Sequence, residues 1–371
     1  MPKLKYPLLA FMLFLVSCDS QEGNSIVAPS SSSSNQNVAA IDYTLGHAMN
    51  ARLGRGINLG NALDAECGAS TGWDECWNNP IKPEYFTIIK KAGFQSVRIP
   101  VRWSEKASDE APFTINPEFT ARVREVVTQA NAAGLVAIIN IHHYDELYND
   151  DKSRTDLELQ KLKFLFLWQQ IAASFADFPN ETLAFELLNE GRNQVSAQLL
   201  NGLITQVWPL IRATNPGRTI IVNPANWGAF SEITTLELPA DGNVIASGHF
   251  YDPHEFTHQG MGIYPQGVSW GTKSDVQDLL LGFESAYQQA QVKWVGTDGG
   301  TIPLNIGEFG ANDNGQLADR ALYTKTIREE CELHSMSWHY WGFTGVQFDA
   351  YVRSTGAWIP EILAALIPSG T

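Results

Sequence analysis

Two glutamates follow short apolar segments that have the composition of buried β-strands. Glu190 ends the stretch LAFELLNE, and Glu308 ends the stretch PLNIGE. A carboxylate in such a position is either the first polar residue of a loop or a working acid, base or nucleophile. One protonated and one ionised carboxyl group are the pair that cleavage of a glycosidic bond requires. The choice therefore depends on whether the fold brings the two glutamates together.

Further polar and aromatic residues follow other segments of the same kind. They are Arg98 near the end of SVRIP, Asn140, His142 and His143 at the end of VAIINIHH, Asn189 next to Glu190, His249 and Tyr251 after VIASG, and Trp341 at the end of SWHYW. Taken singly, each also fits a structural role, such as an ion pair, a strand cap or core packing. Titratable groups at the same end of at least five strands would converge on one pocket, which structural needs do not explain.

The elements that must position these residues alternate along the chain. Strands are predicted at 54–60, 96–100, 136–141, 182–187, 219–223, 244–248, 303–307 and 337–341. Helical spacing predicts helices at 81–92, 118–133, 156–176, 194–214, 274–291, 316–334 and 358–367, and 224–243 is the weakest helical segment. Gly93 and Gly134 stand where helices end. The predicted fold class is α/β, a (β/α)8 TIM barrel in a single catalytic domain, 39–371, with its active site at the carboxyl ends of the strands.

Composition and charge restrict the class of partner. The chain has 371 residues, 44% of them hydrophobic, which is enough for a large core. Its 25 Lys and Arg stand against 40 Asp and Glu, a net charge of −15. Nucleic acid and anionic membranes require a dense basic surface, so neither is an expected partner. A neutral partner is easier to reconcile with this charge.

The N-terminus has the pattern of an export signal. A basic start precedes an apolar stretch from Leu8 to Val16, which is too short to span a bilayer. The sequence LVSC resembles a bacterial lipobox, so 1–17 is predicted to be a lipoprotein-type signal peptide and Cys18 the acylated anchor. An ordinary signal peptide is the alternative. Residues 18–38 predict a Ser-rich flexible linker. We therefore expect an exported lipoprotein on a bacterial membrane, or a secreted protein if Cys18 is not acylated.

The remaining cysteines suggest one bridge. In an exported chain, Cys67 and Cys76 could close a small loop, although their spacing alone does not prove it. Cys331 lies in a helical pattern and is expected to be a buried thiol. No CxxC pair indicates structural zinc.

Seven blocks together resemble glycoside hydrolase family 5, and in particular its bacterial endo-β-1,4-glucanases. In order, they are GINLGNALDA, SVRIPVRWS, NIHHYDEL, FELLNEG, GHFYDPHEFTHQG, PLNIGEFG and WHYWGF, and they cover about residues 52–345. The resemblance implies retention of anomeric configuration, with Glu190 as acid/base and Glu308 as nucleophile. It further implies that Arg98 keeps Glu308 ionised, that Tyr251 orients Glu308 and that Asn189 binds the 2-OH of the sugar in subsite −1.

The same resemblance assigns further residues. His142 and His249 match the two site histidines of the family, and Trp341 would form the floor under the sugar. Substrate-binding positions would be Asn58, His143, Trp77, Trp227, His258 and Trp270, because aromatic rings pack on the apolar faces of pyranoses. Gly191 stands where many relatives have Pro, and MGIYPQGVS lengthens the loop 259–270 before Trp270. Within FELLNEG, Glu186 lies inside the strand and is expected to be a paired structural carboxylate.

Several functions remain in competition at this point. The predicted activity is endo-cleavage of β-1,4-glucan, with mannanase, xyloglucanase or mixed-linkage glucanase activity as alternatives on the same fold. A metal hydrolase that uses the histidines is disfavoured, since no His-x-His or HExxH element is present. An inactive glycan-binding lipoprotein is the alternative from another class. No cofactor is expected, the partner is a neutral β-linked polysaccharide, and the protein is expected to be a monomer.

Overall fold

The structure is a computed structural model that describes residues 41–67, 73–150, 156–297 and 300–368. The predicted signal peptide and linker therefore lie outside the described residues. Within the described part, no helix is both long enough and apolar enough to cross a membrane.

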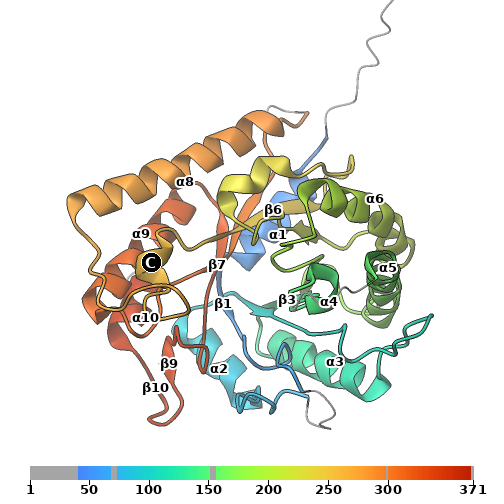
Figure 1. Ribbon diagram of the computed structural model, residues 1–371, viewed down its shortest axis with the longest axis horizontal. Coiled ribbons are helices and arrows are strands. Elements are labelled where there is room, and N and C mark those ends of the chain that lie inside the picture. The colour runs from blue at the N-terminus through green and yellow to red at the C-terminus, as the bar shows by residue number, and fades with distance from the viewer. Residues whose placement is uncertain (1–40, 68–72, 151–155, 298–299, 369–371) are drawn as a thin grey trace, which may run out of the picture. The chain divides into compact units, whose positions relative to one another are not determined.

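Eight parallel strands close into a barrel in the order of the sequence, each paired with the next and β8 paired with β1. The strands are β1 (Arg55–Asn58), β2 (Ser96–Ile99), β3 (Val136–Asn140), β4 (Leu183–Glu186), β5 (Ile220–Val222), β6 (Val244–Phe250), β7 (Leu304–Phe309) and β8 (Ser337–Tyr340). All eight predicted strands and the predicted fold class are confirmed. Figure 1 shows the strands at the centre with helices around them.

The surrounding helices lie where helical spacing predicts them. They are α2 (Pro83–Ala92), α3 (Pro117–Ala132), α5 (Leu157–Ser174), α6 (Ala197–Thr214), α8 (Lys273–Lys293), α9 (Leu317–Leu333) and α10 (Pro360–Leu366). Gly93 follows α2 in a left-handed conformation with φ of 111°, as expected of a helix end. The weakest predicted helix, 224–243, contains only the 3-10 turn η1 (Phe230–Thr235).

Several smaller elements were not predicted. They are α1 (Thr44–Leu53), α4 (Asp145–Tyr148), α7 (His254–Thr257) and the hairpin of β9 (Tyr351–Val352) and β10 (Ala357–Trp358). Cys67 and Cys76, whose pairing the sequence left open, form a disulfide in the loop after β1. Cys331 is a buried free thiol, as expected.

The inside of the barrel has an apolar layer below a polar layer. Met49 and Leu53 of α1 pack against inward-facing side chains of β3 to β6. These side chains are Ile138, Ala184, Ile221 and Ile245. Two residues further along β3 and β4, the inward positions hold Asn140 and Glu186, since side chains of a strand alternate between its faces. The polar layer therefore lies nearer the carboxyl ends of the strands.

A bulge in β7 breaks this alternation. Gly248 and His249 are consecutive in β6, but they pair with Ile306 and Glu308, so Gly307 is an extra residue. Asn305 faces inward and accepts a hydrogen bond from Ser247 Oγ at 2.8 Å. Strict alternation from Asn305 would point Glu308 outward, toward the helices. The bulge turns Glu308 into the barrel mouth.

Candidate active site

Arg98 is the centre of the polar layer. Its guanidinium is fully buried and donates to Glu186 Oε2 at 2.6 Å and Oε1 at 2.7 Å. It also donates to Glu308 Oε1 at 2.6 Å, to Asn58 Oδ1 at 2.9 Å and to Asn189 Oδ1 at 2.7 Å. Burial acts to lower the pKa of Arg98, but the two carboxylates outweigh it and raise the pKa. Arg98 therefore stays charged and fixes the position of four neighbours.

Glu186 is the structural partner of Arg98. It lies 1% exposed and also accepts hydrogen bonds from Asn140 Nδ2 at 3.2 Å and Asn223 Nδ2 at 2.8 Å. Burial acts to raise the pKa of Glu186, but Arg98 outweighs it and the pKa is lowered. The expectation of a paired structural carboxylate is confirmed. Asn223 was missed, although it follows β5 at the next inward position.

Asn58 does not line the cleft, and its prediction as a substrate-binding residue was wrong. Its side chain is fully buried, and Nδ2 lies within 3.0 to 3.3 Å of the carbonyl oxygens of Gly307, His339 and Tyr340. The physical reason is that Asn58 occupies an inward position of β1 below the mouth, where all of its hydrogen-bonding capacity is used. Its side-chain oxygen accepts a hydrogen bond from Arg98 and helps to position the guanidinium.

Glu308 is held on both carboxylate oxygens. Arg98 donates to Oε1 at 2.6 Å, and the Tyr251 hydroxyl donates to Oε2 at 2.9 Å. Its side chain is 6% exposed. The structure thus places Arg98 and Tyr251 in contact with Glu308, where the sequence analysis expects them.

Glu190 lies in the loop after β4 and faces Glu308 across the barrel mouth. His249 Nδ1 lies 2.9 Å from Glu190 Oε1 and 3.7 Å from Glu308 Oε2. One oxygen of each carboxylate and this imidazole nitrogen all lie within 4.8 Å of one another. Glu190 has φ of 44°, a left-handed conformation that non-glycine residues rarely adopt, so the chain turns sharply at this residue.

The charges around Glu190 and Glu308 are strongly coupled. Burial acts to lower the pKa of His249, but Glu308 and Glu190 outweigh it and raise the pKa. Burial raises the pKa of Glu308, and the Glu190 charge adds to this, although His249 and Arg98 oppose it. Burial also acts to raise the pKa of Glu190, but the hydrogen bond to His249 reverses the direction and the pKa is lowered. His249 therefore controls the distribution of protons between Glu190 and Glu308.

His142 is fixed as a hydrogen-bond donor. The amide of Asn140 lies 3.1 Å from His142 Nδ1 and 3.2 Å from Glu186 Oε1, and an amide NH2 donates both hydrogen bonds. Nδ1 of His142 is then the acceptor, and Nε2 carries the hydrogen. Burial, together with the charges of His143 and Arg98, lowers the pKa of His142 well below its usual value, so the ring is neutral.

Trp341 lies beside His142 at the mouth. The two rings are parallel, with an interplanar angle of 2° and centroids 6.0 Å apart. A side chain at Gly60 would meet the indole, because a Cβ there would lie 2.3 Å from it. The indole therefore occupies space that only a glycine in the loop after β1 leaves open.

Trp77 and His143, both expected to bind substrate, lie next to each other at the loop after β1. Trp77 is 42% exposed, and its ring centroid is 5.9 Å from that of His143. His143 Nε2 lies 3.6 Å from the buried carboxylate of Asp64. The structure thus brings Trp77 and His143 together at the surface, and Asp64 was not predicted.

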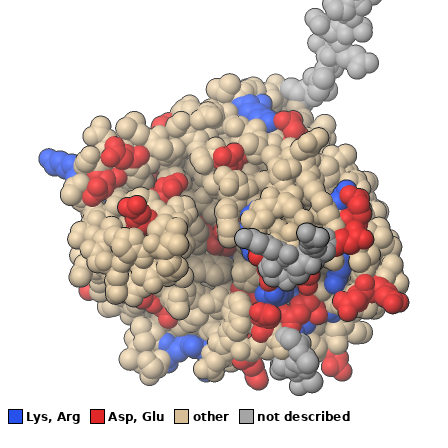
Figure 2. Space-filling model, viewed as in Figure 1, with Lys and Arg blue, Asp and Glu red and all other residues tan. Residues whose placement is uncertain are grey.

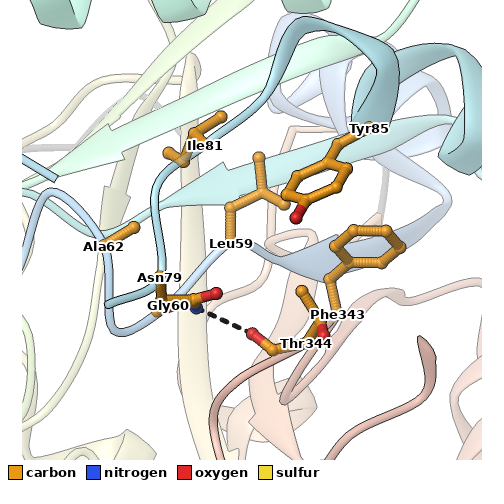
Figure 3. A pocket seen from close by; sticks show the side chains of 8 residues that line it. All are labelled: Leu59, Gly60, Ala62, Asn79, Ile81, Tyr85, Phe343 and Thr344. Carbon is orange, nitrogen blue, oxygen red and sulfur yellow. Dashed lines mark hydrogen bonds between the residues drawn. The ribbon is translucent and has the colours of Figure 1, made fainter. Parts of the chain in front are cut away.

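Asn79 joins the loops that carry Trp77 and Trp341. Its buried amide donates to the carbonyl oxygens of Gly60 at 3.0 Å and Thr344 at 2.8 Å. Figure 3 shows Asn79 reaching Thr344 beside the packed rings of Tyr85 and Phe343. The sequence around a polar loop residue does not indicate which other loop it contacts, so Asn79 was missed.

Trp227 lies on the other side of Glu190 and rests on an arginine. Its side chain is 54% exposed, and the guanidinium of Arg192 lies 4.4 Å from its ring centroid. The same guanidinium lies 4.3 Å from the ring of Tyr148 and forms an ion pair with Asp150. Arg192 was not predicted. It supports an exposed aromatic surface next to Glu190.

A cleft of about 540 Å³ runs from Glu190 past Trp227 toward the loop after β6. Its lining residues are Glu190, Asn226, Trp227, Ala229, Ser231, His249, Tyr251, Asp252, His254, His258 and Tyr264. His258 is therefore in the cleft wall, with its ring 4.9 Å from that of Tyr251. Burial and the charge of His254 lower the pKa of His258 to about 4, so it is neutral. Figure 2 shows a hollow with acidic atoms in it on this face of the molecule.

Trp270 is not in the cleft, so its prediction as a substrate-binding residue was wrong. It is 6% exposed, and its ring stacks on Phe256 at 5.6 Å and meets Tyr323 edge-on at 5.3 Å. The longer loop 259–270 carries Trp270 into the core behind α7 and places Tyr264 in the cleft instead.

The site residues also include candidate metal ligands. Within the described residues, two groups near the barrel mouth each offer three ligand atoms, namely Glu190 with His249 and Glu308, and Asp64 with His142 and His143. The first fits a cation poorly, because Arg98 donates to Glu308 at 2.6 Å and its charge repels a cation there. In the second, Asn140 already occupies His142 Nδ1.

Comparison with known proteins gives consistent matches. Residues 61–345 match the family model described as Cellulase (glycosyl hydrolase family 5). The chain is 30% identical over 325 residues to Endoglucanase H of Acetivibrio thermocellus, covering 86% of this chain and 33% of that protein. It is 28% identical over 348 residues to the xyloglucan-specific endo-beta-1,4-glucanase BoGH5A of Bacteroides ovatus, covering 83% of this chain and 66% of that protein.

A solved structure shows the same likeness. Endoglucanase Cel5A from Thermotoga maritima is 37% identical, with a TM-score of 0.79 over 87% of this chain and 99% of that chain. Structures of Cel5A with mannotriose and with cellobiose match with the same score. The chain thus spans about a third of Endoglucanase H and nearly all of the Cel5A chain. With a family model that matches most of its length, the chain belongs to glycoside hydrolase family 5.

Proposed function

We propose that the protein is a retaining endo-β-1,4-glucanase. The observation that carries this proposal is the approach of Glu190 and Glu308, which have one oxygen each within 4.8 Å. Retaining glycosidases place their two carboxyl groups about 5 to 5.5 Å apart, whereas inverting enzymes leave about 6.5 to 9.5 Å for a water. The separation therefore supports a covalent glycosyl-enzyme intermediate.

In the first step, a carboxylate oxygen of Glu308 attacks the anomeric carbon while the bond to the leaving oxygen breaks. Glu190 donates its proton to that oxygen. In the second step, Glu190 takes a proton from water, and the water oxygen attacks the anomeric carbon and releases Glu308. Arg98 and Tyr251 hold the attacking carboxylate in place throughout, which is the positioning that such a reaction requires.

The buried charges suggest how Glu190 obtains its proton. His249 favours the ionised forms of Glu186, Glu190 and Glu308, and Arg98 favours those of Glu186 and Glu308. Glu190 keeps 20% of its side chain exposed. A bound sugar covers this part, and the lost hydration raises the pKa of Glu190. His249 Nδ1 lies 2.9 Å from Glu190 Oε1, so a proton on this nitrogen can move to Glu190.

Two donors are available to the sugar in subsite −1. Asn189 uses its carbonyl oxygen for Arg98, so its NH2 group is free to bind a sugar hydroxyl. His142 offers Nε2–H, and Trp341 offers an apolar ring face beside it. These contacts support the roles expected of Asn189, His142 and Trp341.

The choice of β-glycan is the open alternative within this mechanism. BoGH5A is named as xyloglucan-specific, and Cel5A has been solved with both mannotriose and cellobiose. A panel of carboxymethylcellulose, mixed-linkage glucan, xyloglucan and mannan, with analysis of product lengths, tests the proposal. Internal cleavage of a β-1,4-glucan is expected, and a preference for mannan over every glucan would refute it.

One variant and one treatment distinguish the proposed enzyme from the alternative functions. Glu308→Gln is expected to release no reducing sugar from carboxymethylcellulose, whereas the unmodified protein does. Equal inactivity of both would favour a glycan-binding protein. Treatment with a chelator is expected to leave the activity unchanged, and a loss that zinc restores would favour a metal hydrolase.

We also propose that Cys18 anchors the protein to a bacterial membrane, and that the enzyme acts as a monomer on a neutral polysaccharide. The lipobox-like LVSC and the Ser-rich segment after it support the anchor. Expression in a bacterial host with labelled fatty acid tests it. Label is expected in the membrane fraction for the full chain and none for Cys18→Ser. Sedimentation of the soluble domain would reveal a dimer.

A further inference from the structure

A cluster of three metal-ligating side chains lies between α8 and α9, outside the cleft. Glu284 comes from α8, and Glu330 and His334 come from the end of α9. His334 Nε2 lies 2.7 Å from Glu284 Oε2 and 3.3 Å from Glu330 Oε1. The side chains of His334 and Glu330 are each 15% exposed, and that of Glu284 is 39% exposed. Figure 1 shows the two helices next to each other on one side of the barrel.

The packing around the cluster fixes the direction of its ligand atoms. The imidazole of His334 stacks on the ring of Tyr287, with centroids 3.8 Å apart and an interplanar angle of 23°. Gln288 Nε2 donates to Glu284 Oε1 at 2.6 Å, which leaves Oε2 directed at the imidazole. A second hydrogen bond to the carboxylate is a support that metal-ligating carboxylates commonly have, and the stacked Tyr287 ring restricts rotation of the imidazole.

We propose that Glu284, Glu330 and His334 bind a divalent transition-metal ion, with Zn²⁺ as the best-fitting class. One imidazole nitrogen and two carboxylate oxygens form a three-ligand set that zinc accepts, with water as the fourth ligand. Ligands about 2.0 to 2.1 Å from a tetrahedral zinc are about 3.3 Å from one another. The separation of His334 Nε2 and Glu330 Oε1 already has this value.

Only a small adjustment completes the site. Glu284 Oε2 would move away from His334 by roughly 0.6 Å to reach the same tetrahedral separation. It comes from a side chain that is more than a third exposed, so this movement costs little packing. The three ligand atoms all lie within 4.8 Å of one another. Bonds to the metal would replace the hydrogen bond between His334 Nε2 and Glu284 Oε2.

An open groove gives the ion access. The groove has a volume of about 670 Å³, and Glu284, Glu330 and His334 lie along it with Leu280 and Leu333. Its apolar walls offer no competing cation, apart from Lys273 at the first turn of α8. An ion and its bound water can therefore enter from solvent.

The location predicts what the metal would do. α9 starts after the carboxyl end of β7 and has 17 residues, so Glu330 lies about 20 Å along the helix from its start. The cluster is therefore near the opposite end of the barrel from Glu190 and Glu308. A metal there would link α8 to α9 and raise the stability without taking part in catalysis.

The experiment uses the full-length chain without a polyhistidine tag, after removal of metals by a chelator. Zinc is titrated in while the thermal midpoint and the zinc stoichiometry are measured. We expect the midpoint to rise with zinc. We expect His334→Ala and Glu330→Gln to abolish this rise or weaken zinc binding at least about tenfold, with activity on β-glucan unchanged.

The active-site cluster serves as the matched control. Glu308→Gln removes a candidate ligand in the cleft and should leave the zinc-dependent rise intact. Visible absorption of Co²⁺ provides a readout that stability does not influence. It should disappear in His334→Ala and persist in Glu308→Gln. Absence of a rise in the unmodified chain, or an equal rise in His334→Ala, would overturn the proposal. If His334→Ala does not fold, Glu330→Gln is tested in its place. An equal zinc-dependent rise of the thermal midpoint in Glu330→Gln would overturn the proposal.

Discussion

The Arg98 side of the catalytic site and the Glu190 side are built in opposite ways. Arg98, Glu186 and Glu308 are at least 94% buried, and each oxygen of the two carboxylates has a fixed donor. Among the residues that the structure describes, His249 is the hydrogen-bond partner of the Glu190 side chain, which remains 20% exposed. A nucleophile benefits from a single position, whereas an acid/base must gain and lose a proton in each cycle. The difference matches the two tasks proposed for the carboxylates.

The largest effect should follow from breaking the Arg98 side. Arg98→Met leaves Glu186 and Glu308 buried without their charge partner, so the free energy of unfolding should fall by about 3 to 5 kcal/mol and activity should vanish. Urea denaturation measures the first effect. Lys161→Met removes an exposed ion pair with Glu158 and should change stability by less than about 1 kcal/mol. Similar losses in the free energy of unfolding for Arg98→Met and Lys161→Met would contradict the proposed importance of the buried ion pairs.

Glu190→Gln should damage the chemistry while sparing the fold. General acid catalysis contributes about 10² to 10⁴ in rate, so kcat/KM on polysaccharide should fall by that factor. Aryl glycosides with good leaving groups need little protonation and should lose less in the glycosylation step. Equal losses on both substrates would argue against Glu190 as the acid. The unfolding transition should remain near that of the unmodified protein.

The coupling between the two sides should be visible in the pH profile. The Glu190 charge raises the pKa of Glu308, and the His249 charge lowers it. Because Glu308 must be ionised to attack, Glu190→Gln should move the acidic limb of kcat/KM on an activated aryl glycoside to lower pH. His249→Asn should move this limb to higher pH. Shifts in the same direction for the two variants would disprove the coupling.

The smallest effect should come from the edge of the Glu190 side. Trp227→Ala removes an exposed ring that rests on Arg192, so kcat/KM on long substrates should fall by about five- to tenfold with little change in stability. Trp270→Ala is the matched control. It empties a buried position and should cost about 3 to 5 kcal/mol of stability while leaving the pattern of cleavage products unchanged.

The sequence predicted the strands, the main helices and the two carboxylates because each depends on local pattern. Apolar runs and helical spacing locate elements, and Glu190 and Glu308 follow strands that must end at one face of a barrel. α1 was missed, since its buried residues, such as Met49 and Leu53, contact strands far along the chain. That contact appears only after the barrel closes.

The errors at the site have a similar cause. A polar residue at the end of a strand can face substrate or the inside of the barrel, and Asn58 faces inward. An aromatic residue in a loop can line a cleft or enter the core, and the lengthened loop carries Trp270 into the core. Arg192 gave no signal in its own segment, because its partners are Tyr148 at the end of α4 and Trp227 in the loop after β5.

The extra residue in β7 has a consequence for how this barrel can be altered. The direction of Glu308 depends on the number of residues between Asn305 and the strand end as much as on the glutamate itself. Transfer of the IGEF segment to another barrel would therefore need Gly307 at the same position in the pairing. A graft that copied every residue type but lost this one-residue offset would direct the carboxylate toward the outer helices.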